Sequence, residues 1–131
     1  VQTKHARAVL SKTVALETVV KQTASLGGFL SGCFLGDIDL IKRSFTDWMV
    51  EPQRAGLIPG FDAAKAIAME HGALGCSISG SGPSLFAWAA SETTAMMVQE
   101  EVTAVFKQQG TEVDSWISPL SPMGARVTGR G

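Results

Sequence analysis

Residues 79–84 read Ser-Gly-Ser-Gly-Pro-Ser and separate two short apolar stretches. Leu74, Cys76 and Ile78 alternate with small residues before this segment, and aliphatic and aromatic side chains alternate over residues 85–88 after it. A period of two is typical of β-strands, so we expect two strands joined as a hairpin. Glycine accepts a positive φ and has no Cβ, which suits a turn whose backbone approaches an anion. We interpret the turn as part of a site; a plain connection between strands is the alternative.

The spacing of residues 79–84 distinguishes this turn from familiar catalytic and phosphate-binding loops. A dinucleotide-binding fingerprint requires glycine at the position of Leu85, and a Walker A loop requires a Gly-Lys-Ser/Thr sequence that does not follow. The sequence also lacks a Gly-x-Ser-x-Gly nucleophile elbow.

The composition is that of one ordinary globular domain. The chain has 131 residues, enough for one core, of which 45% are hydrophobic and 18% charged, and its net charge is -1. Because basic residues are not in excess, we do not expect nucleic acid as a partner. No apolar run reaches the roughly 18 residues of a membrane span, and residues 1–5 lack the apolar core of a signal peptide. We expect a single cytoplasmic domain, residues 1–131, with no membrane partner.

Helical spacing of apolar residues dominates residues 4–71. A first apolar face extends from Val9 to the glycine pair at residues 27–28, where either a break or close packing is expected. Asp37 is placed to cap the next helix, and a further helix covers residues 61–70.

The second half of the chain reads strand, strand, helix, strand, strand. Its helix begins at Ser91 and ends before Gly110. Val113 and Ile117 alternate with more polar positions, and residues 125–128 add a last edge strand. This order implies the α+β class, with helices packed on one face of a four-stranded antiparallel sheet.

Two segments carry basic residues suited to an anion. Thr3, Lys4 and Arg7 lie at one-turn spacing near the start of a helix, where a cation and a hydroxyl can converge; solvated terminal charges are the alternative. Arg54 lies in a loop held between Pro52 and Pro59. Its guanidinium suits a carboxylate, and a surface ion pair with its neighbour Glu51 is the alternative.

The cysteines and histidines give no sign of a metal site. Cys33 and Cys76 lack Cys-x-x-Cys spacing, and we interpret both as reduced, buried, small side chains. His5 and His71 have no partners at metal-ligand spacing.

Three segments, taken in order, resemble a known family. They are Thr-Lys-x-Ala-Arg at residues 3–7, Glu-Pro-x-Arg-x-x-Leu-Ile-Pro-Gly at residues 51–60 and Gly-x-x-Ile-Ser-Gly-Ser-Gly-Pro-Ser at residues 75–84. Together they resemble the C-terminal half of the homoserine kinases, which are GHMP small-molecule kinases. The glycine-rich motif occurs across GHMP kinases, and the two arginine-bearing motifs narrow the resemblance to this family.

The resemblance implies a ferredoxin-like GHMP C-terminal domain and phosphoryl transfer from ATP, with Mg2+, to the hydroxyl of L-homoserine on the way to threonine. It also implies that Arg7 and Arg54 grip the substrate carboxylate, with Thr3 and Lys4 nearby. The turn residues implied to border the transferred phosphate are Gly80, Ser81 and Gly82. In such kinases catalysis consists mostly of positioning and of stabilising phosphate charge.

The sequence departs from the family in one large respect. The family's N-terminal half, with its Pro-x-Gly-x-Gly-x-Gly-Ser-Ser type nucleotide loop, is not in residues 1–131. The catalytic acid or base, the magnesium ligands and the adenine pocket are therefore unassigned, and we expect the chain alone to be inactive. Its expected partners are L-homoserine, its own N-terminal domain and a second copy in a homodimer. The alternatives are another GHMP kinase and a non-catalytic amino-acid-binding module, and a nucleotide loop encoded upstream would separate the last from the kinases.

Overall fold

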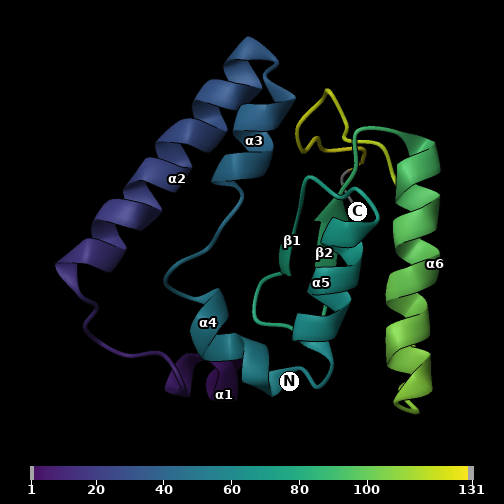
Figure 1. Ribbon diagram of the computed structural model, residues 1–131, viewed down its shortest axis with the longest axis horizontal. Helices are drawn as coiled ribbons and strands as arrows, with labels where there is room; N and C mark the ends of the chain where they lie inside the picture. The colour runs from purple at the N-terminus through teal and green to yellow at the C-terminus, as the bar shows by residue number, and fades with distance from the viewer. Residues whose placement is uncertain (1, 130–131) are drawn as a thin grey trace.

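The computed structural model describes residues 2–129, which combine helices with one β-hairpin (Figure 1). In chain order the elements are α1 (Thr3–Ala8), α2 (Leu16–Leu35), α3 (Ile38–Ser44), α4 (Glu51–Arg54), the 3-10 turn η1 (Ala55–Leu57), α5 (Phe61–Glu70), β1 (Gly75–Ile78), β2 (Leu85–Trp88) and α6 (Glu92–Gln108). Figure 1 shows α2 and α3 as a pair on one side, α5 and α6 with the hairpin on the other, and α1 beside α4. The α+β class is confirmed.

The hairpin has the expected strands and turn. β1 and β2 are antiparallel, with Cys76 opposite Ala87. Beyond the strands, the Ser79 N–H donates to the Ser84 carbonyl at 2.8 Å. The turn between them contains two glycines with positive φ, Gly80 at 59° and Gly82 at 75°. Both values lie in the left-handed region that favours glycine.

Helices α5 and α6 cover one face of the hairpin, where two clusters form the core. The buried members of these clusters are Ile58, Phe61, Ala64 and Phe106 in the first, and Ala68, Ala73, Cys76 and Val98 in the second. Leu85 packs against both clusters from β2. The expected cap of α6 is formed, because the Ser91 hydroxyl accepts the Thr94 N–H at 3.1 Å.

The opposite face of the hairpin is also covered, so the expectation of helices on one face only is incomplete. Phe45, at the end of α3, lies 5.6 Å from Trp88 and 5.9 Å from Phe86, centroid to centroid. Phe29 of α2 lies 5.4 Å from Trp88. Gly75 makes room for this cluster, since a Cβ there would lie 2.1 Å from the Phe45 ring.

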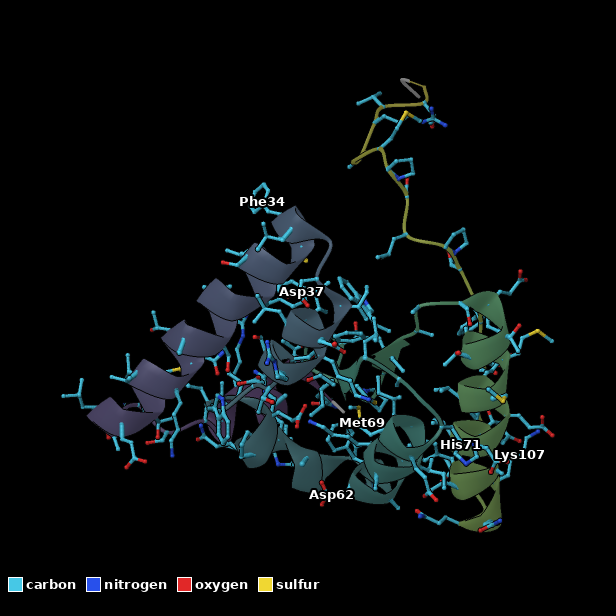
Figure 2. The ribbon with its side chains drawn as sticks, turned by 45° about the horizontal axis from the view of Figure 1, so that its top comes forward. Phe34, Asp37, Asp62, Met69, His71 and Lys107 are labelled. Atoms are coloured by element: carbon cyan, nitrogen blue, oxygen red, sulfur yellow. The ribbon has the colours of Figure 1, made fainter. Side chains whose placement is uncertain are left out.

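Helix α2 is continuous across residues 27–28, so the expected break is wrong, and close packing is found at Gly28 but not at Gly27. A Cβ on Gly28 would lie 2.3 Å from the Ser44 hydroxyl of α3. The helix begins at Leu16 and not near Val9. Figure 2 shows Asp37 between α2 and α3, where its carboxylate caps α3 as expected. No helix within residues 2–129 combines the length and apolar character that a membrane crossing requires.

The expected third and fourth strands do not form, and the sheet of residues 2–129 has two strands rather than four. Instead, the side-chain amide of Gln99 in α6 donates a hydrogen bond to the Ser115 hydroxyl at 3.0 Å. Pro119 and Pro122 lack the N–H groups that a ladder needs, and the alternation before them is short. Figure 2 shows the last part of the chain, in yellow, projecting from the body.

Candidate functional site

Arg54 joins the three segments that the sequence singled out. Its Nε donates to the Ala6 carbonyl of α1 at 2.9 Å, and its Nη1 donates to the Gly80 carbonyl of the turn at 3.0 Å. The alternative ion pair with Glu51 is wrong, because Glu51 pairs with Lys65 instead. Residues 51–54 are a short helix rather than a loop. The guanidinium is therefore fixed between α1 and the hairpin turn.

The start of α1 also contacts the turn. The hydroxyls of Thr3 and Ser81 lie 3.3 Å apart, and α1 begins at Thr3 as the spacing predicts. Lys4 and Arg7 are exposed on the same helix. Neither side chain makes a hydrogen bond or ion pair within residues 2–129, so both charges are available to an external anion. Two of the candidate side chains contact the turn directly. They are Thr3, through Ser81, and Arg54, through Gly80.

The two turn glycines face different surroundings. A Cβ on Gly80 would meet nothing within 4 Å, whereas a Cβ on Gly82 would lie 2.9 Å from the Ile58 Cδ1 in the core. Gly80 thus borders open space beside Arg54. At Gly82 the positive φ of 75° favours glycine, and an added Cβ would also press on the end of the Ile58 side chain.

Sequence reasoning missed the polar contacts that hold α4. The Ser77 hydroxyl of β1 donates to Glu51 Oε2 at 2.6 Å, and Lys65 of α5 binds the other carboxylate oxygen. Asp47 accepts the N–H of Met49 at 2.8 Å, and it also accepts the N–H of Glu51 at 3.1 Å. Ser77 in an apolar strand and Lys65 in an alanine-rich helix were the available signals. Periodicity alone did not pair them.

The two cysteines differ, and only one matches its interpretation. Cys76 is fully buried, and burial raises the pKa of its thiol to about 11, with the Lys65 charge opposing and the Glu51 charge adding to that rise. A thiol with this pKa is a poor nucleophile at neutral pH. Cys33 is exposed on α2, so the expectation that it is buried is wrong.

The site is defined by its polar contacts. Two surface hollows among the described residues lie away from it, along α6 and the turn after it, and are lined by residues between 96 and 115. Within residues 2–129 no three His, Cys, Asp or Glu side chains come together as a metal site would require. The chemistry that this part of the chain offers is anion binding by a fixed guanidinium beside exposed backbone.

Comparisons with known proteins agree on one family. Residues 29–108 match the family model of the GHMP kinases, C-terminal part. Homoserine kinase of Chlorobium phaeobacteroides strain BS1 is 44% identical over 129 residues, 97% of this chain and 40% of its own length. Homoserine kinase of Xylella fastidiosa strain 9a5c is 40% identical over 126 residues, 96% of this chain and 39% of its own length.

A solved structure agrees with the sequence relatives. The crystal structure of homoserine kinase from Cytophaga hutchinsonii matches with a TM-score of 0.82 and 47% identity, over 83% of this chain and 35% of that one. The chain spans about 40% of the length of the relatives named above. With the family model covering more than half of its residues, the chain belongs to the GHMP kinase family, whose C-terminal part it matches.

Proposed function

We propose that residues 1–131 are the C-terminal, substrate-binding domain of a homoserine kinase. The full protein would transfer the γ-phosphoryl group of ATP to the hydroxyl of L-homoserine, giving O-phospho-L-homoserine for threonine biosynthesis in the cytoplasm. The observation that carries this proposal is the fixed guanidinium of Arg54, held by two carbonyl oxygens between α1 and the turn. The names of the relatives support the same substrate.

In this proposal Arg54 and Arg7 bind the substrate carboxylate. Arg54 uses Nε and Nη1 to hold its place, and its Nη2 has no partner within residues 2–129. Arg7 follows Ala6, whose carbonyl anchors Arg54, and its own charge is exposed. Two cations on either side of one carboxylate would orient the substrate for transfer.

The remaining candidates have supporting roles. Thr3 and Lys4 lie near the carboxylate, and Gly80, Ser81 and Gly82 border the side of the transferred phosphate. The Thr3–Ser81 contact supports the nearness of these two groups of residues. An ordered turn fixes the distance between bound groups, which is how a positioning enzyme gains rate.

We assign ATP and Mg2+ mainly to the N-terminal domain of the full protein. Within residues 2–129 no three His, Cys, Asp or Glu side chains come together, so these residues offer no complete metal site of their own. When bound, the nucleotide supplies the phosphoryl group; the residues described here bind and orient the acceptor. The 131-residue chain alone is accordingly expected to be inactive, and its proposed partners are that domain and a second copy.

The test is the substitution Arg54→Lys in the full-length protein. Lysine keeps the charge but loses the planar fork, so the KM for homoserine should rise while the KM for ATP stays constant. Loss of a charge-assisted hydrogen bond costs about 1.5–3 kcal/mol, or roughly a ten- to hundredfold loss of kcat/KM. Arg7→Ala should act likewise. Arg43→Lys, an exposed arginine of α3, is the matched control.

A substrate analogue completes the test. Homoserine amide, which lacks the carboxylate, should be as poor a substrate for the unmutated enzyme as homoserine is for the variants, and should lose little more with them. If the two losses instead multiply, the arginines do not bind the carboxylate. If another alcohol proves the better substrate, the protein is a different GHMP kinase.

A further inference from the structure

Glu51 is the one charged side chain that is buried among residues 2–129, with 9% of its surface exposed. Both oxygens of its carboxylate are used. Oε1 accepts from Lys65 of α5, and Oε2 accepts from the Ser77 hydroxyl of β1 at 2.6 Å. Burying a charge is costly even when the charge is paired, and a buried ion pair is weak evidence of a stabilising role. The cost raises the question of what this arrangement holds in place.

Helix α4 depends on these contacts for its position. Four residues form a single turn, which has no stability of its own in water. Its first N–H groups are accepted by the carboxylate of Asp47, at 2.8 Å for Val50 and 3.1 Å for Glu51. Its place relative to the hairpin is fixed by side chains. Glu51 is the side chain at its start, and Arg54 is the side chain at its end.

These two side chains both bind the segment of the hairpin from Ser77 to Gly80. Glu51 binds Ser77, and three residues later on both segments Arg54 binds the Gly80 carbonyl at 3.0 Å. Two bridges fix the rotation of α4 as well as its distance from the hairpin, whereas one bridge alone would leave the rotation free. Lys65 adds a third point from α5.

We infer that Glu51 is a positioning residue for Arg54. By clamping the start of α4 to β1 and α5, it holds the guanidinium at the end of α4 between α1 and the turn. Its own carboxylate is buried and each oxygen binds a protein side chain, so it acts through Arg54 and not on the substrate. The expected change in the homoserine KM rests on the proposed function. The contacts of Glu51 that hold α4, which we call the clamp, do not depend on the ligand.

The experiment uses Glu51→Gln and Ser77→Ala in the full-length protein. Glutamine keeps the size and one acceptor oxygen of Glu51, and alanine at position 77 removes one bridge with little change in volume. Each should raise the KM for homoserine about fivefold to tenfold, the worth of one lost hydrogen bond. The value of kcat and the KM for ATP should stay within about twofold. Glu70→Gln, an exposed carboxylate of α5, is the matched control.

A second readout does not depend on catalysis. The Arg54 Nε–H is bonded to the Ala6 carbonyl, and its exchange with solvent, followed by NMR in the full-length protein, should accelerate by about tenfold in Glu51→Gln and Ser77→Ala. In an Arg54→Lys background the same substitutions should add little to the KM, because the group they position is gone.

The outcomes separate the inference from the proposed function. Unchanged Nε–H exchange in folded variants overturns the positioning role, and a fall in kcat at constant KM together with that unchanged exchange would make Glu51 a catalytic group. Accelerated exchange with an unchanged homoserine KM keeps the clamp and contradicts carboxylate binding by Arg54. Accelerated exchange together with a raised KM supports both.

Discussion

Helix α4 and the outer side of α2 differ in whether their side chains find partners within the chain. Both charged side chains of α4 have partners, since Glu51 binds two side chains and Arg54 binds two carbonyl oxygens. The side of α2 away from α3, which we call the α2 outer face, is the opposite case. Figure 2 shows its Phe34 pointing away from the rest of the molecule. Its large apolar side chains are exposed: Leu16 by 79%, Val20 by 59%, Leu30 by 48% and Phe34 by 88%.

This difference shows which surfaces the chain covers with its own residues and which it leaves exposed. The charged residues of α2, Glu17 and Lys21, pair with each other near its start. The helix is thus apolar on the outer face as well as toward α3, a pattern found in buried helices. Residues 2–129 complete the surroundings of α4 and leave the α2 outer face open. Four measurements test this comparison.

The largest expected effect is in thiol reactivity. At pH 8 a thiol with the pKa of Cys76, about 11, is thiolate in roughly one molecule in a thousand, and the side chain is also buried. An alkylating reagent should therefore modify Cys33 at least about a hundredfold faster than Cys76 in the native chain. Mass spectrometry of tryptic peptides gives both rates, and urea should make them similar. Equal rates without urea would show that the core opens readily.

Stability should show the next largest effect, at the interface between α3 and the hairpin. Gly75→Ala places a methyl group 2.1 Å from the Phe45 ring, and overpacking of this kind costs about 1–3 kcal/mol. Gly27→Ala is the matched control on α2, where a Cβ meets nothing within 4 Å. It should stabilise the chain by about 0.5–1 kcal/mol, because alanine favours helix. Urea unfolding gives both values, and equal signs would contradict the contrast in packing.

Local signals in the sequence predicted much of this fold. The period of two on both sides of residues 79–84 gave the hairpin, and Asp37 and Ser91 marked the starts of α3 and α6. Each of these signals lies within one element or one turn, where the spacing of residues along the sequence determines their spacing in space. The α+β class follows from their order, and so does the grouping of α5 and α6 on one face.

Contacts between distant segments were not predictable from spacing. Phe45 packs against Gly75, which is 30 residues later in the sequence, and the Glu51–Ser77 hydrogen bond joins residues 26 apart. The candidate arginine itself was identifiable by its chemistry, but its carbonyl partners were not. Alternation at Val113 and Ile117 predicted a strand, yet a strand also needs a neighbour to pair with. Residues 2–129 supply none there.

A smaller effect concerns the α2 outer face directly. The isolated 131-residue chain should bind a hydrophobic dye, and Leu30→Lys with Phe34→Lys should lower that fluorescence several-fold. Both positions are exposed, so the free energy of unfolding should change by about 0.5 kcal/mol or less. Met96→Lys with Met97→Lys, at exposed apolar positions of α6, is the control and should leave dye binding unchanged. Dye binding that resists the α2 substitutions would locate the open surface elsewhere.

The smallest effect is at the one ion pair of α2. The pKa of Glu17 is lowered, first by its hydrogen bond with Lys21 and then by the Lys21 charge, across 2.6 Å. Lys21→Gln should return the pKa toward its ordinary value in an NMR titration, whereas Lys42→Gln on α3 should leave it unchanged.

The sign of the accompanying pH dependence follows from the direction of this shift. A carboxyl pKa lowered by folding adds stability above its unfolded value, and that stability is lost as the pH falls through the folded value. Because the Glu17 side chain is exposed, solvent and salt screen the pair, and the thermal midpoint should not change measurably on Lys21→Gln. Glu17 also lies in the first turn of α2, where the helix dipole favours a negative charge. A pKa that stays low in Lys21→Gln would therefore assign the shift to the helix terminus instead of to the lysine.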